Sequence, residues 1–383
     1  MIELNIIGVT HVSDLYPNVK YKIPLIASLK DVSVSTTIHN LDSTGHFSNL
    51  SNKNLLKKAF LAGKFCWQTL SVFIRSMFNK APNIYICYPG VFLALLYSFV
   101  PRSRRPVIFF DAFISLYDTA INDRKLYSPT SLPARILYRL EARAFEVADK
   151  IITDTEENAA FYASLFAQSK DKFNAIQLCI PPLEHPPRER SANSSFSCLF
   201  IGSLVPLHGI GLILETIALL SDQSQIRFKI IGDGQDGKQV EEFLNRQHLP
   251  QLSWDRGFYP TAYLQEEIAK ADLCLGIFGE SEKAGRVIPY KIYYYAAMSK
   301  AFITRSTPCF ERINKTLSEP LMLVSGQDPE ELAKLIVQLA KEPKLIEQQT
   351  RLSREFHMKH LSQTAISEKL GSLFSTFGKP RQT

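Results

Sequence analysis

Short apolar runs alternate with amphipathic stretches along the whole chain. Apolar runs predict strands, and longer stretches with apolar positions three or four residues apart predict helices. In the first half, the predicted strands are 2–7, 84–87, 106–110 and 150–153, and the predicted helices are 55–78, 90–100 and 134–148. The second half has predicted strands at 198–201, 227–231, 271–276 and 301–304, and helices at 209–220, 237–246 and 289–298. Strands that alternate with helices indicate parallel sheets covered by helices on both faces.

A segment rich in proline and small polar residues, 180–195, separates the two halves. This composition is typical of a linker, so we place the domain boundary there. The predicted domains are 1–182 and 196–361, with a linker at 183–195 and a final helical segment at 362–383. The fold class is therefore α/β, with two doubly wound, Rossmann-like domains facing each other across a cleft. Ligands of such folds bind at the carboxyl ends of the strands, beside helix N-termini.

The composition is that of a globular protein. With 383 residues the chain can form two cores, and its hydrophobic fraction is 45%. The segment 1–8 resembles a buried strand and not a signal peptide, and the longest apolar run, 91–100, is about half a bilayer crossing. The six cysteines and eight histidines are scattered and lack the spacing of a metal site. A net charge of +7 without interleaved basic and aromatic motifs gives no reason to expect nucleic acid. We expect a cytoplasmic protein without a metal.

The loop after the first strand of the second half contains closely spaced glycines. Gly202 and Ser203 follow the strand at 198–201, and His208 and Gly209 precede the next helix. Glycines let main-chain N–H groups approach an anion, and a helix N-terminus favours negative charge. A tight turn without a ligand fits the same pattern, so both interpretations stay open.

A second glycine loop, Gly232–Gly237, matches G-x-G-x-x-G. Alone, this match would indicate a dinucleotide site and a nicotinamide-dependent oxidoreductase, with Asp255 as the one nearby residue to hold a ribose. The motif follows the second strand of its domain and not the first. A structural loop, or one that lines a donor site, is therefore the preferred interpretation.

The third motif, 276–298, passes from a strand through a polar loop into a helix that begins with Pro289. Its cations and the main-chain amides at the helix start predict a diphosphate cradle. The residues concerned are Lys283, Arg286, Ile288, Tyr290 and Lys291. A solvated, charged loop without a ligand is the alternative.

Asp111 stands at the carboxyl end of the strand at 106–110, where an open sheet presents side chains to its cleft. A carboxylate there can orient a sugar or acceptor hydroxyl, or act as a base. A helix N-cap is the other role that this position allows.

Together these motifs resemble the family-four retaining glycosyltransferases of the GT-B fold, most strongly over 106–305. The resemblance implies that the second domain binds a nucleotide-diphosphate sugar and that the protein has no other cofactor. It also implies a metal-independent enzyme, because the chain lacks the Asp-x-Asp motif that holds the metal–nucleotide complex in the other main glycosyltransferase architecture. Ser203 and His208 stand where the family holds the donor phosphates.

The resemblance also assigns roles in the reaction. Arg286 and Tyr294 stand where the family carries two glutamates, which contact the transferred sugar and the ribose, and Glu280 could substitute for one of them. The family's equivalent of Asp111 faces the reaction centre, and its last helix, here within 362–383, crosses back to the first domain. The implied reaction transfers the sugar with retention, while helix N-termini and cations stabilise the leaving diphosphate.

The predicted function is therefore transfer of a sugar from a nucleotide sugar to a glycan or lipid-linked glycan acceptor, in cell-surface polysaccharide biosynthesis. The absence of both family glutamates favours one alternative, a catalytically silent glycosyltransferase-like subunit that binds or scaffolds a partner.

The predicted helix at 57–78 carries its charged and apolar residues on opposite sides. Lys57, Lys64 and Arg75 share one stripe. The other side holds Cys66, Trp67, Leu70, Phe73, Ile74 and Met77. We expect the apolar side to pack on the N-terminal sheet. The alternative is an interfacial helix at the inner face of the plasma membrane, which would suit a lipid-linked acceptor.

Overall fold

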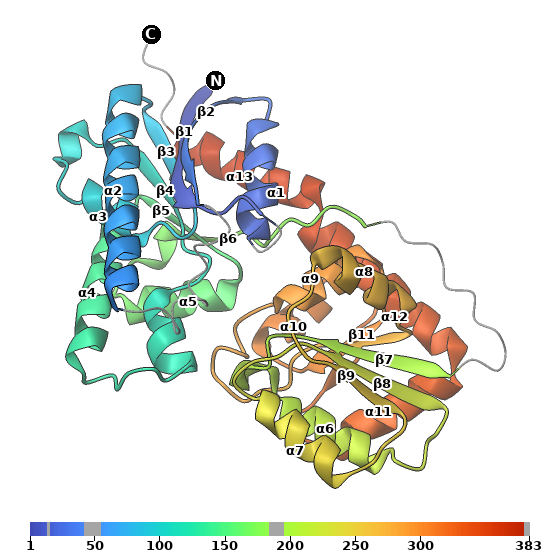
Figure 1. The fold of residues 1–383 in the computed structure, drawn as a ribbon. Helices are drawn as coiled ribbons and strands as arrows, with labels where there is room; N and C mark the ends of the chain where they lie inside the picture. Colours follow the sequence, from blue (N-terminus) through green and yellow to red (C-terminus); the bar gives the residue numbers. More distant parts are fainter. Residues whose placement is uncertain (14–15, 42–54, 184–194, 379–383) are drawn as a thin grey trace. The chain divides into compact units, whose positions relative to one another are not determined.

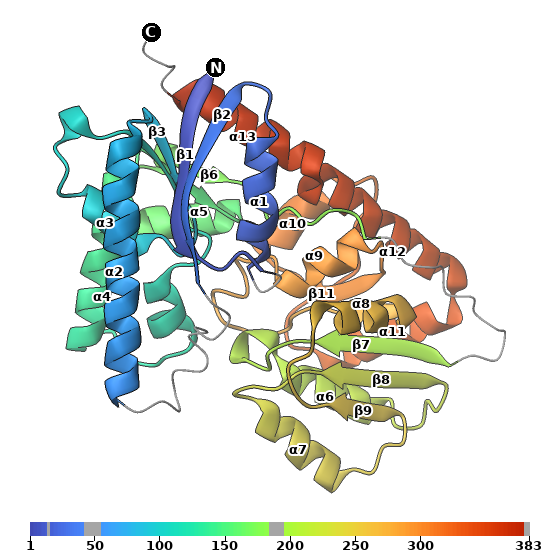
Figure 2. The same ribbon diagram turned by 45° about the horizontal axis from the view of Figure 1, so that its top comes forward.

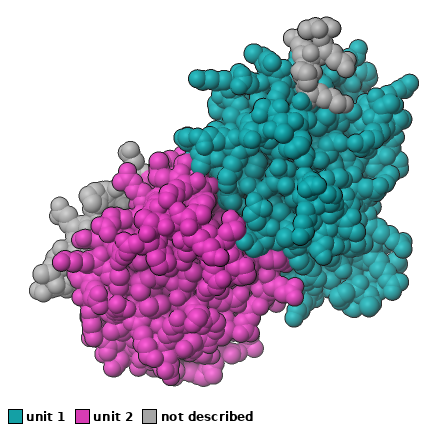
Figure 3. All heavy atoms as spheres, turned by 180° about the vertical axis from the view of Figure 1, so that it is seen from behind, with its two compact units in different colours: residues 1–179, 363–383 teal, residues 180–362 magenta. Residues whose placement is uncertain are grey.

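The computed structural model describes residues 1–13, 16–41, 55–183 and 195–378. The chain divides into two compact units, which we call unit 1 (residues 1–179 and 363–383) and unit 2 (residues 180–362) (Figures 1 and 3). Most of the predicted linker at 183–195 lies outside the described residues.

Unit 1 contains a parallel sheet of six strands in the order β2-β1-β3-β4-β5-β6. The strands are β1 (Ile2–Thr10), β2 (Val32–Asn40), β3 (Asn83–Ile86), β4 (Val107–Asp111), β5 (Lys150–Thr153) and β6 (Phe173–Ala175). Because β2 and β3 lie on opposite sides of β1, the chain reverses its direction of winding there. Every strand predicted for this half is present; β5 has the predicted bounds, and the ends of the others are shifted by up to three residues.

Helices cover both faces of this sheet (Figures 1 and 2). One face carries α2 (Leu55–Asn79), α3 (Val91–Tyr97), α4 (Leu132–Val147) and α5 (Glu156–Leu165), and the other carries α1 (Pro17–Ala27) and α13 (Gln363–Phe377). The second face is closed by aromatic packing, since the rings of Tyr85 and Phe109 meet Phe374 of α13 edge to face. The last helix therefore belongs to the core of unit 1, although unit 2 precedes it in the sequence.

The orientation of α2 corrects one expectation. The residues that face the core are Gln68, Thr69, Val72 and Ser76, while most of the apolar stripe is exposed. The exposed members are Cys66, Trp67, Leu70, Ile74 and Met77, and only Phe73 is half-buried. The prediction that the apolar side packs on the sheet is wrong for these residues, because the side chains that are buried on the inner side of the helix are mainly small and polar. Ser76, for example, lies 2.6 Å from the hydroxyl of Tyr97. The side chain of Lys57 lies outside the described residues.

Unit 2 repeats the design with the strand order β12-β11-β10-β7-β8-β9, again all parallel. The strands are β7 (Phe196–Ile201), β8 (Ile226–Ile231), β9 (Leu252–Asp255), β10 (Leu273–Leu275), β11 (Phe302–Arg305) and β12 (Leu323–Val324). The helices are α6 (Ile210–Leu219), α7 (Gly237–Arg246), α8 (Thr261–Lys270), α9 (Tyr290–Ala297), α10 (Pro308–Asn314), α11 (Pro329–Lys341) and α12 (Pro343–Phe356). The predicted α/β fold with two parallel sheets is confirmed.

The chain leaves unit 2 through a π-helical turn, His357–Leu361. The buried His357 ring lies with Nε2 2.9 Å from the carbonyl oxygen of Ile180, the first residue of unit 2. This contact joins the two places where the chain passes between the units. Burial lowers the pKa of His357, although the hydrogen bond to Ile180 opposes that shift.

Candidate functional site

The topology of unit 2 marks one place at the edge of its sheet. β7 and β10 are neighbours in this sheet. From β7 the chain passes through α6 to β8 on one side, and from β10 it passes through α9 to β11 on the other side. The connections that follow β7 and β10 therefore run in opposite directions. A crevice forms at such a switch point, outside the carboxyl ends of the strands.

Glycines bring the loops at this edge into main-chain contact. Gly232 has φ +139°, and a Cβ atom there would lie 1.8 Å from the carbonyl oxygen of Gly202. Gly234 has φ +158°, and a Cβ atom there would lie 1.9 Å from the carbonyl oxygen of Ser203. Packing against the β7 loop therefore explains both glycines without a dinucleotide. Asp255, the suggested ribose ligand, is 2.9 Å from Lys229 and accepts a 2.5 Å hydrogen bond from Tyr263.

The β10 loop is joined to the β7 loop in the same way. The amides of Phe278 and Gly279 donate to the carbonyl oxygens of His208 and Leu207, at 3.0 and 3.2 Å. Gly209 has φ +63°, and a Cβ atom there would lie 2.5 Å from the main chain of the β10 loop. Arg305 and Gln327 donate to the carbonyl oxygens of Gly279 and Phe278. This loop was expected to carry the site, and these two supporting side chains were not predicted.

Gly202, His208 and Lys291 meet at the centre of this edge. A Cβ atom on Gly202 would lie 2.7 Å from Cε1 of His208 and 2.9 Å from Nζ of Lys291. Lys291 is only 8% exposed; its Nζ donates to the carbonyl oxygen of Gly276 at 3.3 Å and lies 3.6 Å from the centre of the Phe200 ring. Among the described residues, no carboxylate lies within ion-pair distance of Lys291.

The electrostatics of this group are those of a site that lacks an anion. Burial holds the pKa of Lys291 well below its ordinary value. Burial, together with the nearby charge of Lys291, lowers the pKa of His208 well below 6.5, so its ring is neutral. Nδ1 of His208 is buried and has no hydrogen-bond partner within the described structure. Buried polar atoms are rarely left unpaired, so the arrangement is suited to a ligand that carries negative charge and accepts hydrogen bonds.

Helix α9 adds main-chain donors to the same place. It begins after Pro289, and no side chain from the described residues caps its first turn. The first amides of a helix have no partner within the helix and carry partial positive charge. Ile288 is buried just before this turn, and Tyr290 is exposed at its start, with its hydroxyl 3.0 Å from that of the buried Tyr294.

The remaining predicted donor residues lie further out. Ser203 and Glu280 are exposed, and Lys283 and Arg286 are half-buried in the polar loop between β10 and α9. Arg286 donates from Nε to the carbonyl oxygen of Glu282 at 3.3 Å. The structure thus brings Gly202, His208, Gly209 and Lys291 together. Ser203, Glu280, Lys283 and Arg286 lie in the surrounding loops.

Asp111 of unit 1 has a different environment from the one expected. It is 2% exposed, and its Oδ2 accepts hydrogen bonds from Lys22 of α1 at 3.1 Å and from Tyr85 of β3 at 2.6 Å. Within the described structure its Oδ1 has no hydrogen-bond partner. Its Oδ2 partners do not include the main-chain amides that an N-cap would bind. These contacts favour a role in holding α1 on the sheet, and the catalytic role of Asp111 stays a prediction.

Glu141 of α4 holds the loop that follows β4. This fully buried carboxylate accepts hydrogen bonds from Ser115 Oγ at 2.8 Å and from the amides of Leu116 and Tyr117 at 2.9 and 2.8 Å. Burial raises its pKa, and these three donors oppose the shift. This role could not be predicted from the residue pattern, because Glu141 lies in an ordinary amphipathic helix.

Unit 1 has its own switch point, between β1 and β3. Thr10 Oγ1 donates to the carbonyl oxygen of Tyr88 at 2.7 Å, which joins the ends of the two strands. A chain of aromatic rings lines this edge. His11 stacks on Tyr16 at 5.3 Å between centroids, Tyr16 lies 6.2 Å from Tyr88, and Tyr88 lies 5.8 Å from Phe113. These rings were not predicted from the sequence, because only the sheet order identifies β1 and β3 as neighbours.

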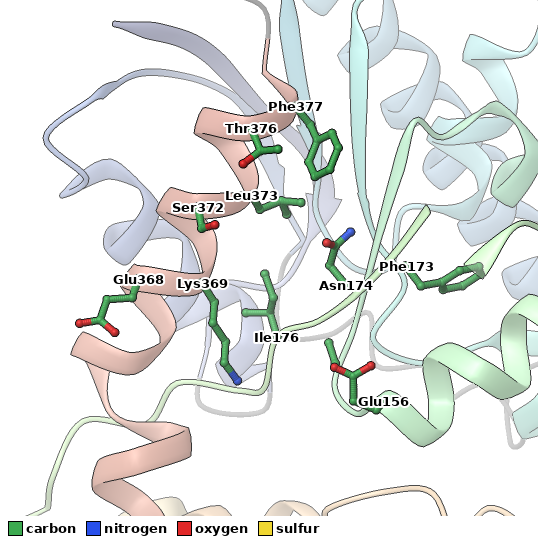
Figure 4. A pocket seen from close by; sticks show the side chains of 11 residues that line it. Glu156, Phe173, Asn174, Ile176, Glu368, Lys369, Ser372, Leu373, Thr376 and Phe377 are labelled. Carbon is green, nitrogen blue, oxygen red and sulfur yellow. The ribbon is translucent and has the colours of Figure 1, made fainter. Parts of the chain in front are cut away.

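A separate hollow of about 520 Å³ lies in unit 1 between α13 and the β6 edge (Figure 4). Its lining includes two carboxylates, Glu156 and Glu368, as well as Lys369. Lys369 donates to Gln177 Oε1 at 2.5 Å. The hollow is at the β6 edge of the sheet and not at the β1–β3 switch point of unit 1, and its mixed charge is unlike that of the Lys291 group.

Within the described parts of the chain, no group of three or more histidine, cysteine or carboxylate side chains is arranged to hold a metal ion. None of the described helices combines the length and apolar character that a bilayer crossing requires.

The comparisons with known proteins agree with this architecture. HepE from Anabaena in complex with UDP-glucose superposes with a TM-score of 0.66 and 12% identity, over 98% of this chain and 100% of HepE. The lipopolysaccharide outer core galactosyltransferase WaaB superposes with a TM-score of 0.60 and 12% identity, again over 98% of this chain and 100% of WaaB. TarM from S. aureus superposes with a TM-score of 0.57 and 13% identity, over 76% of this chain and 54% of TarM.

The fold is GT-B. Within this GT-B chain, residues 195–342 match the family described as glycosyl transferases group 1. The matched part contains both glycine loops and the whole Lys291 group. No curated protein matches the sequence.

Proposed function

We propose that this GT-B chain is a glycosyltransferase whose unit 2 binds the diphosphate of a nucleotide sugar beside Lys291. The observation that carries the proposal is the buried lysine without a carboxylate, next to the unpaired Nδ1 of His208 and against Gly202, where only a glycine leaves room for both side chains. A diphosphate supplies the negative charge and the acceptor oxygens that this group lacks. The match of residues 195–342 to glycosyl transferases group 1 supports the same ligand class.

In the proposed reaction the anomeric C–O bond to the diphosphate breaks as the acceptor hydroxyl attacks the anomeric carbon. Lys291 and the first amides of α9 stabilise the negative charge that develops on the leaving phosphate oxygen. Transfer occurs with retention and without a metal, and Arg286 and Asp111 are proposed to act near the transferred sugar. Removing the acceptor proton is the step for which a base is needed, and Asp111 is the candidate from the sequence.

The proposed acceptor is a glycan or lipid-linked glycan used in cell-surface polysaccharide synthesis. The aromatic edge of unit 1 supports a carbohydrate acceptor, because rings such as Tyr16, Tyr88 and Phe113 offer apolar faces and hydroxyl groups together.

A thermal-shift screen with UDP, GDP, ADP and CMP sugars tests donor binding. A ligand at 100 times its Kd stabilises the folded state by about 2.7 kcal/mol, which gives a clear rise in Tm. We expect one nucleotide class to produce the rise, and Lys291→Met to cut it to about half or less. Gly202→Ala should weaken binding as well, because the new methyl group would fill the space beside Lys291 and His208.

Lys300→Met is the matched control. Lys300 is also buried in unit 2, but it donates to the carbonyl oxygens of Ala269 and Ala271 at 2.7 and 3.1 Å, before the start of β10. It should therefore keep the ligand-induced rise in Tm. If Lys291→Met keeps the rise too, the diphosphate binds elsewhere.

A silent, binding-only subunit is the second candidate, and Tyr294 favours it. This side chain is buried and meets Tyr290 where the resemblance expects the ribose glutamate. Slow hydrolysis of the bound nucleotide sugar, measured by release of nucleoside diphosphate, separates the two functions. Binding with no release and no transfer to a glycan acceptor would support the silent subunit.

A further inference from the structure

Helix α2 exposes a large set of apolar side chains on its outer side. Its inner side carries the buried Gln68, Thr69, Val72 and Ser76, and the half-buried Phe65 and Phe73 also pack against the core. Its outer side carries Phe60, Trp67, Leu70, Ile74, Met77 and Phe78, all exposed. The most exposed are Phe60 at 73%, Trp67 at 70% and Phe78 at 79%. At 100° per residue these six positions fall within one stripe, opposite the side that packs on the sheet.

Two further exposed aromatic residues belong to the neighbouring helix α3 and the turn after it, and we call the combined set the α2 face. It consists of the outer residues of α2 together with Phe92 and Phe99. Phe92 meets the half-buried Phe65 of α2 edge to face at 6.0 Å, and Tyr97 meets Phe73 at 5.0 Å, so α3 runs alongside α2 in the same direction. Figure 1 shows the two helices side by side on the outside of the unit 1 sheet. An exposed apolar surface of this kind marks a binding site for a protein or a membrane.

Charge distinguishes between these partners. The 25 residues of α2 include Lys57, Lys58, Lys64 and Arg75, and no aspartate or glutamate. Lys80 and Arg104, which follow α2 and α3, are exposed. A second copy of this chain, paired through α2 about a twofold axis, would bring like charges together with no carboxylate on the helix to offset them. A surface rich in anionic lipid offsets all of them.

We propose that the α2 face binds the surface of an anionic lipid bilayer, with α2 lying parallel to the membrane. At 1.5 Å per residue α2 is about 37 Å long, and its stripe runs along most of that length. The aromatic and aliphatic side chains enter the boundary between headgroups and acyl chains, while Lys64 and Arg75 stay at the edge of the stripe among the headgroups. This inference does not depend on the proposed function.

Co-sedimentation of the full chain with lipid vesicles tests the proposal. The vesicles contain phosphatidylcholine alone or phosphatidylcholine with phosphatidylglycerol. We expect the chain to partition into the anionic vesicles and far less into the neutral ones. Each basic residue near an anionic surface contributes about fivefold, so Lys64→Gln with Arg75→Gln should weaken binding to anionic vesicles by roughly tenfold or more.

Trp67→Glu with Ile74→Glu tests the apolar part of the face. Both side chains are exposed, so the double variant should fold normally and lose at least about tenfold in binding. Leu219→Glu on α6 is the matched control, because Leu219 is a half-exposed apolar residue of unit 2 and not part of the α2 face. Fluorescence gives a second readout: vesicles should shift the Trp67 emission to shorter wavelength, and Trp67→Phe should abolish that shift. Trp254 is the only other tryptophan in the chain.

The outcomes are distinct. Binding that depends on both anionic lipid and the α2 face supports the proposal. No binding of the wild-type chain to either vesicle overturns it, as does binding that survives the Trp67→Glu, Ile74→Glu double variant. A concentration-dependent dimer that this double variant dissociates would assign the face to a second copy instead. Nucleotide binding is measured separately by thermal shift, so failure of the donor-site proposal leaves this result unaffected.

Discussion

Lys22 in unit 1 and Lys291 in unit 2 are both buried beside the carboxyl ends of strands, but only one has a protein counter-charge. Lys22 lies 3.1 Å from Asp111, and Tyr85 donates to the same carboxylate oxygen. Lys291 meets a carbonyl oxygen, an aromatic face and a neutral histidine, and the described residues offer it no carboxylate. The first arrangement has a counter-charge within the protein, whereas the second has none, and we propose that a ligand supplies it. Burial of a charge therefore does not by itself identify a binding site; the missing partner does.

The largest expected effect is on the stability of unit 1. Lys22→Met leaves Asp111 as a buried carboxylate without its ion-pair partner, which should lower the free energy of unfolding by about 3–5 kcal/mol. Urea denaturation followed by circular dichroism measures the loss. The double variant Lys22→Met, Asp111→Leu should recover most of it, because it removes both charges. A loss below about 1 kcal/mol for Lys22→Met would mean that the pair does not stabilise the fold.

Lys291→Met should have the opposite profile. Removing a buried charge that has no protein partner should leave the free energy of unfolding unchanged or raise it. The loss of a hydrogen bond to a charged group, about 1.5–3 kcal/mol, should weaken nucleotide binding by roughly tenfold to 100-fold. Isothermal titration calorimetry and urea denaturation on the same preparation measure the two effects. A variant that loses stability as much as Lys22→Met does would end the contrast between the two lysines.

The pH dependence sharpens the same contrast. In the free protein, burial lowers the pKa of both His208 and Lys291, so the unfolded chain binds more protons. Stability should therefore fall as the pH drops below the ordinary pKa of each group, 10.5 for Lys291 and 6.5 for His208. A bound diphosphate favours the protonated forms, so its affinity should rise as the pH falls, by at most about tenfold per pH unit for each proton taken up. Calorimetry in buffers of different ionisation enthalpy measures the proton uptake. Affinity that is independent of pH from 5 to 8, with no uptake, would exclude a contact with His208.

The smallest effect is expected at the outer loop. Arg286 is half-buried and donates to the carbonyl oxygen of Glu282, so Arg286→Ala should weaken binding of the nucleoside diphosphate only a few-fold, as is usual for exposed charges. If Arg286 contacts the transferred sugar as proposed, turnover of the nucleotide sugar should fall much more than binding. Comparison of kcat with the Kd for the nucleoside diphosphate checks this. Equal and large losses in both would make Arg286 part of the diphosphate site itself.

Much of the fold could be predicted because hydrophobic period and turn residues are local signals. The strand at 150–153 and the helix at 237–246 were predicted with the bounds that the structure has. The predicted start of α9 at Pro289 was also close, since proline at a helix entry has a local geometric cause. The direction in which α2 faces was not predictable in this way. Its apolar stripe has the spacing of a buried helix, and the choice of inner side depended on how Val72 and Ser76 fit against the sheet and α3.

The candidate site, too, could be predicted only in part from the sequence. The sequence by itself determined that glycine loops and cations follow the strands of the second half, because residue type and order fix which strand end each one follows. Only the tertiary structure decided that Lys291 lies against Gly202 and His208, that Asp111 is paired with Lys22, and that Gly232 packs on the β7 loop. These contacts join residues far apart in the chain, and whether a buried charge is neutralised depends on which atoms lie within a few ångströms of it, a distance that residue order does not specify.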